Sequence, residues 1–322
     1  MILKFVKKVP GGMMVIPLLI GSFLYTFLPS ILEIGGLSSA IFSKAGTATT
    51  IGFALVCIGS QLSFKQAPTA LKRGGVLLLT KFLAGALFGI VVGKLFGNAG
   101  ILGISSLAII SSVTNSNGGL FMALAGQFGD SEDVASQAVM NINDGPFLTL
   151  VALGASGLAE IPLLGLLAAI GPILIGCILG NLDSEIRDFL KPGVAISIPF
   201  FAFCLGAGIN LTSVVTAGPS GIILGLLCIV VSGVPMFFAD RYINKRPGYA
   251  AAAASSAAGN SVATPAAVAL IVAEYVPFVE AATAQIAAAV VVTAILTPLL
   301  TAWVAKKFGS PETGMKEKFV TN

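Results

Sequence analysis

The sequence predicts an all-α integral membrane protein, with ten transmembrane helices arranged as two inverted five-helix repeats and two crossing broken helices. Three observations predict this fold class. Hydrophobic residues make up 56% of the 322-residue chain and charged residues only 10%, which is far more apolar than a soluble domain of this length. Ten apolar stretches approach the roughly 20 residues that a helix needs to cross a bilayer. Two of these stretches are interrupted by similar polar segments, one in each half of the chain.

The ten predicted spans follow one another without a long polar insertion. They cover about residues 11–28, 46–62, 74–96, 101–128 (broken), 134–158, 162–179, 194–209, 219–239, 248–275 (broken) and 279–304. The only polar tail is the short stretch 306–322. We therefore expect a first five-helix repeat in residues 1–160, an inverted second repeat in 161–308 and a cytoplasmic tail in 309–322.

The basic residues predict the orientation of these spans. If the N-terminus is cytoplasmic, the inside segments hold Lys4, Lys7, Lys8, Lys65, Lys72, Arg73, Arg187, Lys191, Arg241, Lys245, Arg246, Lys306, Lys307, Lys316 and Lys318. The outside segments then hold Lys44 and Lys94, and Lys81 lies within the third span. Because cytoplasmic segments carry an excess of Lys and Arg, both termini are expected in the cytoplasm.

Short matches in the same order in both halves predict a duplication. The matched pairs are Pro17-Leu18-Leu19-Ile20-Gly21-Ser22 with Pro172-Ile173-Leu174-Ile175-Gly176-Cys177, Cys57-Ile58-Gly59-Ser60 with Cys204-Leu205-Gly206-Ala207, and Pro146-Phe147-Leu148-Thr149 with Pro298-Leu299-Leu300-Thr301. Five is an odd number, so a second repeat of five spans enters the membrane from the opposite side. Inverted repeats are typical of transporters that work by alternating access.

The two polar interruptions, residues 111–119 and 255–265, are the candidate binding site. A helix in lipid must pair its backbone groups, so broken segments of this kind line an enclosed or watered cavity, and in secondary transporters they mark the binding site. Their neutral donors and acceptors suit a hydroxylated solute, and half-helix N-termini favour an anionic group. Together these features favour a sugar acid. The candidate substrate-binding residues are Thr114, Asn115, Ser116, Asn117, Gly118, Asn260, Ser261 and Thr264. The alternative is a pair of kinks that satisfy their own hydrogen bonds, as in a rigid channel or scaffold helix.

Asp144 is the candidate carrier of a coupling proton. It lies near the middle of the fifth span, where an ionised side chain costs at least about 2.5–3.5 kcal/mol. Gln137, Asn141 and Asp144 are spaced to share one helical face, and desolvation of Asp144 would favour its protonated form. Lys81 is either a charge partner of Asp144 or of the solute, or a lysine that snorkels to the cytoplasmic surface. The alternative for Asp144 is a structural ion that stays charged.

Other residues narrow the function class. The chain contains no histidine, which excludes a His proton relay and a Ser-His-Asp triad. Cys57, Cys177, Cys204 and Cys228 lack the close spacing of a metal motif and are expected to be small packing residues. A membrane enzyme such as a prenyl transferase would need Asp-rich metal motifs, which the sequence lacks, so neither enzyme activity, cofactor nor metal is expected. The acidic residues at span ends, including Asp130 and Asp133, are expected to lie in solvated loops.

Several stretches resemble the 2-keto-3-deoxygluconate permease family. They are Val9-Pro10-Gly11-Gly12-Met13-Met14, Asn117-Gly118-Gly119-Leu120-Phe121, Gly180-Asn181-Leu182-Asp183, Ile198-Pro199-Phe200-Phe201-Ala202-Phe203 and Val262-Ala263-Thr264-Pro265. The resemblance implies a bacterial inner-membrane proton symporter for 2-keto-3-deoxygluconate, related in fold to the bile acid:sodium symporters. By that likeness, spans one, two, six and seven form a panel, and the other six form a moving core.

The expected function is therefore proton-coupled symport of 2-keto-3-deoxygluconate or a similar sugar acid into the cell. Its partners are the sugar acid, the proton and the lipid bilayer, with no nucleic acid. A sodium-coupled organic anion symporter and a passive organic anion channel remain alternatives. The second broken span lacks the acidic residue that helps to bind sodium in the bile acid symporters, which argues against sodium coupling.

Overall fold

The computed structural model describes residues 2–8, 12–62, 68–143, 145–160, 163–208 and 210–311. Within these ranges the chain forms helices joined by turns and one isolated β-bridge between Ile101 and Ile104. An apolar chain that crosses lipid cannot leave its backbone N–H and C=O groups unpaired. Helices pair these groups within one segment and are therefore the expected structure.

The first half of the chain contains helices of very different length. They are α1 Ile2–Lys8, α2 Gly12–Phe27, α3 Pro29–Leu32, α4 Gly36–Phe42, α5 Thr47–Ser60, α6 Pro68–Phe96, α7 Ser106–Val113, α8 Gly118–Phe128, α9 Ser131–Ala135, α10 Gln137–Met140 and α11 Phe147–Ser156. Short 3₁₀ turns occupy Lys44–Gly46 and Asn141–Asn143.

The second half follows a similar pattern of long and interrupted helices. They are α12 Leu163–Leu182, α13 Ser184–Gly206, α14 Leu211–Thr216, α15 Gly218–Leu227, α16 Gly233–Tyr242, α17 Tyr249–Ala254, α18 Thr264–Ala269 and α19 Val279–Phe308. A π-helical turn, Cys228–Ser232, joins α15 to α16. Further 3₁₀ turns occupy Asn260–Ala263 and Ala273–Phe278.

The chain is a multi-pass membrane protein, although its helices vary in how fully they could span a bilayer. In the described part of the chain, five helical segments are long and apolar enough: Pro68–Phe96, Ser106–Phe128, Ser184–Gly206, Gly218–Tyr242 and Ala273–Phe308. A sixth arises if α4 and α5, bent by 66°, form one span. Shorter apolar helices lie at Val15–Phe27, Phe147–Ser156 and Ile170–Leu182. The ten-span count from the sequence thus includes several spans shorter or more interrupted than expected.

The predicted fifth span is not one continuous α-helix. Helix α10 ends at Met140, a 3₁₀ turn follows, and α11 begins only at Phe147. Gly145 has a φ of 95°, a conformation that favours glycine, and Pro146 lacks the N–H needed to continue a helix. The single helical face predicted for Gln137, Asn141 and Asp144 therefore does not extend past Met140, and Asp144 itself lies outside the described residues.

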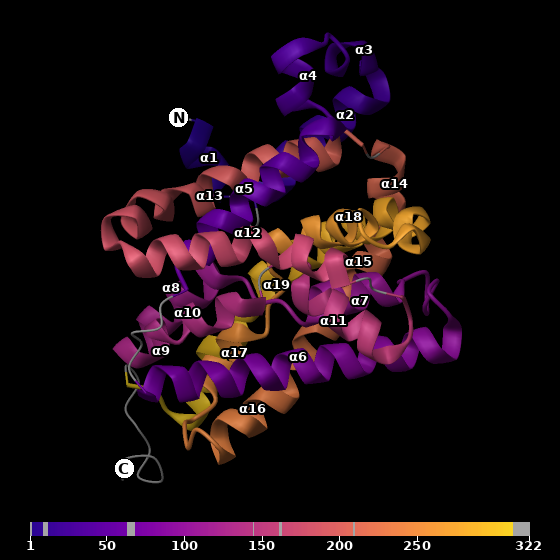
Figure 1. Cartoon of the computed structure of the whole chain (residues 1–322). Coiled ribbons are helices and arrows are strands. Elements are labelled where there is room, and N and C mark those ends of the chain that lie inside the picture. Colours follow the sequence, from indigo (N-terminus) through magenta and orange to yellow (C-terminus); the bar gives the residue numbers. More distant parts are fainter. Residues whose placement is uncertain are drawn as a thin grey trace.

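Four helices, α2, α5, α12 and α13, pack into one layer that we call the panel. Helix α12 lies along α5, and α13 lies along both α2 and α5. In Figure 1 these four helices run across the upper half of the molecule, below α3 and α4, while α6 and α16 run along its lower edge. The shorter helices α7, α15 and α18 lie between, together with α19. The panel contains the four spans that the family likeness assigns to it.

Glycines let the panel helices approach to backbone contact. At five positions a Cβ on the glycine would overlap a carbonyl oxygen of the facing helix: Gly21 with Phe203, Gly206 with Leu18, Gly59 with Ile173, Gly176 with Val56, and Gly180 with Ser60. The first two join α2 to α13, and the last three join α5 to α12. Small residues at membrane helix interfaces allow this close approach.

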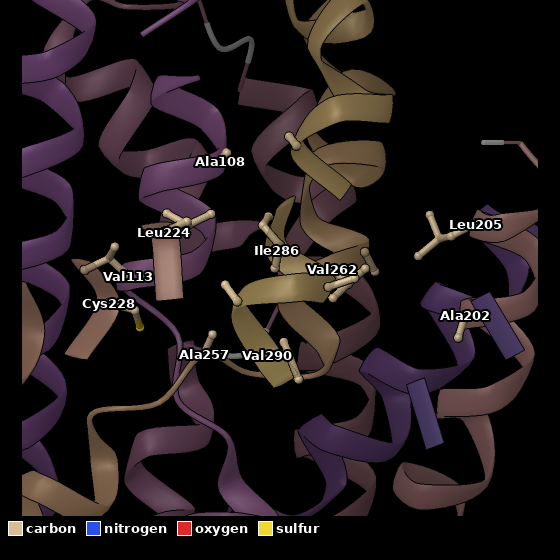
Figure 2. Close-up of a cluster of buried hydrophobic side chains, with 14 of the residues drawn as sticks. Ala108, Val113, Ala202, Leu205, Leu224, Cys228, Ala257, Val262, Ile286 and Val290 are labelled. Carbon is tan, nitrogen blue, oxygen red and sulfur yellow. The ribbon is translucent and has the colours of Figure 1, made fainter. Parts of the chain in front are cut away.

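The largest hydrophobic cluster connects the panel with the rest of the protein. Figure 2 shows Ala257 and Val262 from the second broken segment beside Ile286 and Val290 of α19. The same cluster includes Ala202 of α13. The second break is therefore embedded in apolar packing, and its polar groups must find partners inside the protein.

We predict that Gly59→Ala destabilises the protein because the new methyl group would meet the Ile173 backbone. Overpacking of this kind costs about 1–3 kcal/mol. The measurement is thermal unfolding followed by a thiol-reactive dye that labels the buried cysteines. Gly52→Ala on the same helix is the matched control, since nothing lies within 4 Å of its Cβ position. Equal melting temperatures for the two variants would contradict the close contact.

Candidate functional site

The two broken segments touch each other inside the protein. Helix α7 ends at Val113 and α8 starts at Gly118, while α17 ends at Ala254. The Ser116 hydroxyl donates a hydrogen bond of 2.9 Å to the Ala254 carbonyl oxygen. The backbone N–H of Asn117 donates to the Ser256 hydroxyl at 3.0 Å. The structure thus brings together the two polar interruptions that the sequence singles out.

Lys81 binds the end of the first half of the second broken segment. Its Nζ donates to the carbonyl oxygens of Ala254 at 2.9 Å and Ser256 at 3.0 Å, and to the Ser232 hydroxyl at 3.2 Å. The side chain is only 1% exposed. A cation at a helix C-terminus is favourable because the last carbonyls carry partial negative charge. Lys81 therefore lies in the protein interior at the break and does not snorkel to the surface.

Neutral groups satisfy the carbonyls at the first break. The Thr114 hydroxyl donates to the Ile110 carbonyl oxygen at 2.7 Å, and the Asn115 amide donates to that of Ser111 at 2.9 Å. The Asn143 amide donates to the Thr114 carbonyl oxygen. The two breaks therefore differ in charge, since a lysine ammonium serves the second and only amides and hydroxyls serve the first.

Several buried acceptors near the breaks have no hydrogen-bond partner among the described residues. They include Asn115 Oδ1, Gln137 Oε1, Asn143 Oδ1, Thr264 Oγ1 and the hydroxyl oxygens of Ser111 and Ser112. Leaving such a group unpaired costs about 1–3 kcal/mol each. Three of them are amide oxygens, which only accept hydrogen bonds. They match a ligand that presents hydroxyl donors.

The N-terminus of α8 is the more open part of the site. Asn117 caps the helix, its Oδ1 accepting from the Leu120 N–H at 3.1 Å. Asn117 and Gly118 are half-buried and Gly119 is exposed. A Cβ at Gly118 would overlap the Gln137 amide, so the glycine brings the polar pair Gln137 and Asn141, which are hydrogen-bonded to each other, close to the helix start. Such an end favours an anionic group.

A cavity of about 10 Å³ lies where the panel meets the second broken segment. Its panel wall is apolar, from Ile51, Ala54, Leu55 and Ile58 on α5 and Phe201 on α13. Its opposite wall consists of Gly145, Pro146, Asn260, Ala263, Thr264 and Ala267. This volume is near the lower limit for one water molecule, so no sugar acid fits there in this conformation.

The predicted site residues divide into two groups by exposure. Asn117, Gly118, Asn141 and Asn260 are half-buried. Thr114, Asn115, Ser116, Ser261, Thr264, Gln137 and Lys81 are buried. Asn260 and Thr264 lie at the cavity, whereas Ser116 and Asn117 lie at the contact between the breaks. The proton-coupling candidate Asp144 lies outside the described residues, although its neighbours Asn143 and Gly145 lie at the first break and at the cavity.

Sequence reasoning missed several residues that complete this site. Ser256 and Ser232 bind Asn117 and Lys81, and Asn143 binds the first break. Ser256 lies within the second polar interruption and Asn143 beside Asp144, so their positions carried a signal. No sequence signal pointed to Ser232, a lone polar residue in an apolar span, or to Phe201, an apolar residue of the cavity wall.

A second polar network, which we call the ionic cluster, consists of Arg73, Asp130, Asp133, Arg246 and Tyr249. Arg73 binds Asp130 at 2.7 Å and Asp133 at 2.8 Å, and Arg246 binds them at 2.8 and 3.0 Å. The Tyr249 hydroxyl donates to Asp133 at 2.6 Å. Asp133 is 1% exposed, so the expectation that it lies in a solvated loop is wrong. Ion pairs with two arginines that are distant in sequence compensate the loss of hydration of the buried carboxylate.

Asp130 titrates below the ordinary range for an aspartate. Burial raises its pKa, but the Asp133 backbone N–H and the guanidinium groups of Arg246 and Arg73 lower it by more. A carboxyl with a depressed folded-state pKa stabilises the protein above its unfolded pKa, and this stabilisation is lost as the pH falls through the folded-state pKa. Acid therefore weakens the contribution of Asp130 to the ionic cluster.

The chain matches known transport proteins over nearly its whole length. The model of the family described as 2-keto-3-deoxygluconate permease matches residues 3–310. The 2-keto-3-deoxygluconate permease 1 of Salmonella typhimurium is 51% identical over 304 residues, covering 94% of this chain and 95% of that protein. The 2-keto-3-deoxygluconate permease of Bacillus subtilis is 41% identical over 308 residues, covering 94% and 93%.

A solved structure also shares the fold. It is a sodium proton antiporter from Methanocaldococcus jannaschii, with a TM-score of 0.58 and 14% sequence identity, covering 92% of each chain. At this identity the likeness concerns the fold alone. It relates the arrangement of helices described above to that of a membrane transporter.

We predict that Lys81→Met lowers thermal stability because the Ala254 and Ser256 carbonyls lose a charged donor. An unsatisfied buried acceptor costs about 1–3 kcal/mol. The measurement is the melting temperature of the purified protein without solute. The control is Lys94→Met near the end of the same helix, where the lysine is exposed. If Lys81 served only as a charge partner for the solute, the variant would melt like the wild type and lose only binding.

Proposed function

The chain belongs to the 2-keto-3-deoxygluconate permease family, and from this membership we propose that it takes up 2-keto-3-deoxygluconate or a similar sugar acid by proton-coupled symport. As a member of a permease family it is a transporter and not an enzyme. The observation that carries the proposal is the contact between the two broken segments, beside buried acceptors that lack partners. This arrangement fits a solute with several hydroxyl groups and one carboxylate.

The solute's two kinds of polar group have different partners in this proposal. Its carboxylate binds near the half-buried start of α8, where Asn117 and Gly118 begin a half-helix with its positive dipole end. Its hydroxyl groups donate to the unpaired amide oxygens of Asn115 and Gln137 and to Asn260 beside the cavity. Each such hydrogen bond contributes about 0.5–1.5 kcal/mol, or more where one partner is charged. The proposed site therefore selects a polar anion of sugar size.

Transport by alternating access is supported by the size of the cavity. Small-molecule sites usually enclose about 300–1,000 Å³, whereas the cavity between the panel and the second broken segment measures about 10 Å³. Binding therefore requires the panel helices α5 and α13 to separate from α18 and its preceding turn. The panel side of this boundary is apolar, with Ile51 and Phe201, and offers few hydrogen bonds that would resist such a movement.

The panel glycines support the inverted repeat of residues 1–160 and 161–308. In the sequence match between repeats, four of the five glycine contacts of the panel correspond to one another in pairs. The two matched pairs are Gly21–Phe203 with Gly176–Val56, and Gly59–Ile173 with Gly206–Leu18. Contacts exchanged in this way are expected when two similar halves pack about a two-fold axis. The proposed architecture is ten spans with spans 4 and 9 broken, and both termini on the cytoplasmic side of the bacterial inner membrane.

Proton coupling is proposed to run through Asp144. Its sequence neighbours lie at the site: Asn143 donates to the first break, and Gly145 lines the cavity. The proposal rests on these two neighbours and on the cost of an ionised side chain in the middle of the fifth span. Lys81 is engaged by the second break, and Gln137 and Asn141 supply the polar surroundings.

Uptake into proteoliposomes tests the proposed function. Labelled 2-keto-3-deoxygluconate should accumulate inside vesicles under an inwardly directed pH gradient, and a protonophore should abolish the accumulation. Accumulation that follows a sodium gradient would favour a sodium-coupled symporter. Flux without accumulation would favour a passive channel. Either result would overturn proton symport.

We predict that Asn117→Ala and Asn260→Ala each weaken binding of 2-keto-3-deoxygluconate. A lost hydrogen bond to the charged carboxylate at Asn117 is worth about 1.5–3 kcal/mol, which corresponds to about ten- to a hundred-fold in affinity. A lost hydrogen bond to a neutral hydroxyl at Asn260 is worth about 0.5–1.5 kcal/mol, or about two- to ten-fold. The measurement is calorimetric titration of the purified variants. Asn210→Ala, at an exposed position outside the site, is the control and should bind like the wild type. Unchanged affinity in both site variants would contradict the proposed location.

We predict that Asp144→Asn uncouples transport from the pH gradient. The amide cannot take up a proton, so the variant should bind and exchange solute between the two sides yet lose uphill accumulation. Counterflow and gradient-driven uptake in the same vesicle preparation separate these activities. Accumulation at the wild-type level would exclude Asp144 as the proton carrier. Loss of binding or folding would instead indicate a structural ion.

A further inference from the structure

Asp240 lies beside the ionic cluster but does not share its cations. It is on α16 and is 1% exposed. Its Oδ1 accepts a hydrogen bond of 3.0 Å from the Asn244 amide, and its Oδ2 has no partner among the described residues. A carboxylate has roughly four lone-pair positions that can accept hydrogen bonds. With a single hydrogen bond, the ionised form of Asp240 lacks most of the partners that it needs.

The surrounding charges do not compensate a third carboxylate. Arg73 faces Asp240 from α6 and Arg246 from the turn before α17, and both guanidinium groups already bind Asp130 and Asp133. Tyr249 on α17 donates its hydroxyl to Asp133 and adds no positive charge. Two arginines thus meet two carboxylates, and an ionised Asp240 would leave one negative charge uncompensated. A buried group in that position neutralises itself by binding a proton.

We propose that Asp240 is a proton-binding site separate from Asp144, and that release of its proton weakens the ionic cluster. The protonated side chain of Asp240 is neutral, so Arg73 and Arg246 stay bound to Asp130 and Asp133. Once ionised, Asp240 competes for the guanidinium groups of Arg73 and Arg246. Each movement of a guanidinium toward Asp240 lengthens its contact with Asp130 or Asp133.

The position of the cluster links this proton to the binding site. Helix α8 runs from the first break to Phe128, two residues before Asp130, and α17 runs from Tyr249 to the second break. The two half-helices pack against each other, and the ionic cluster fastens their ends opposite the breaks. A weaker cluster therefore allows the two breaks to shift relative to each other. This link to solute affinity rests on the proposed function, whereas the protonation of Asp240 does not.

Infrared spectroscopy of the purified full-length protein in lipid nanodiscs tests the protonation directly. An exposed aspartate has a pKa of about 3.9, so at pH ~6 it contributes little to the carbonyl-stretch band of a protonated carboxyl. With ¹³C-labelled aspartate, we expect such a band at this pH in the wild type and in Asp144→Asn. It should be absent, or reduced by the intensity of one group, in Asp240→Asn. Asp188→Asn, at an exposed position on α13, is the control and should keep the band.

Hydrogen exchange of residues 249–254 tests the effect on α17. On alkalinisation, exchange in this segment should rise more than in the buried segment 284–289 of α19, and the excess should vanish in Asp240→Asn. An identical pH response in the two proteins would overturn the link to the cluster. If Asp240→Asn does not fold, the spectrum of Asp144→Asn still tests the protonation of Asp240. The absence of any protonated-aspartate band in that spectrum would overturn the proposal. Uptake by the wild type tests the transport function independently of either result.

Discussion

The need to pair backbone groups inside the membrane governs this structure. Breaking two helices within the protein interior frees backbone carbonyl and N–H groups that lipid cannot satisfy, and the surrounding helices supply their partners. Lys81 on α6 donates to the Ala254 carbonyl oxygen of the second break. From α19, the Thr297 hydroxyl donates to the Ser255 carbonyl oxygen at 3.3 Å, and the Thr293 hydroxyl accepts from the Ala257 N–H at 3.0 Å. The breaks therefore fix the relative positions of the helices around them. The polar groups at the breaks that still lack hydrogen-bond partners form the candidate binding site.

The uneven distribution of charge at the breaks has a physical consequence for an anionic solute. Lys81 places one positive charge in a region of low dielectric, where electrostatic interactions extend further than in water. The start of α8 adds the positive end of a helix dipole. Both favour a carboxylate near the breaks, while the apolar panel wall contributes shape and excludes water. In the proposed function, selectivity for a sugar acid then arises from neutral acceptors rather than from a second cation.

The sequence carried the breaks, the apolar spans and the candidate residues, because helix interruption and hydropathy are local properties. It could not reveal which partners the breaks would find. Lys81 and Ala254 are 173 residues apart, and only the tertiary fold shows that they meet. The interruption of the fifth span was visible in Gly145-Pro146, but hydropathy continues across these residues and outweighed that signal. The burial of Asp133 was hidden for the opposite reason, since an acidic run between two helices is usually solvated and its two arginines come from distant segments.

The small cavity beside Asn260 also has a consequence for the electrochemical gradient across the membrane. With space near the limit for a single water molecule and an apolar wall formed by α5 and α13, this cavity holds no file of water molecules across the boundary. Under the proposed proton symport, a membrane that holds many idle copies in this shape would keep its electrochemical gradient, because the gradient is drawn down only in step with solute movement. Expression of the transporter in advance of its nutrient would then carry no standing leak.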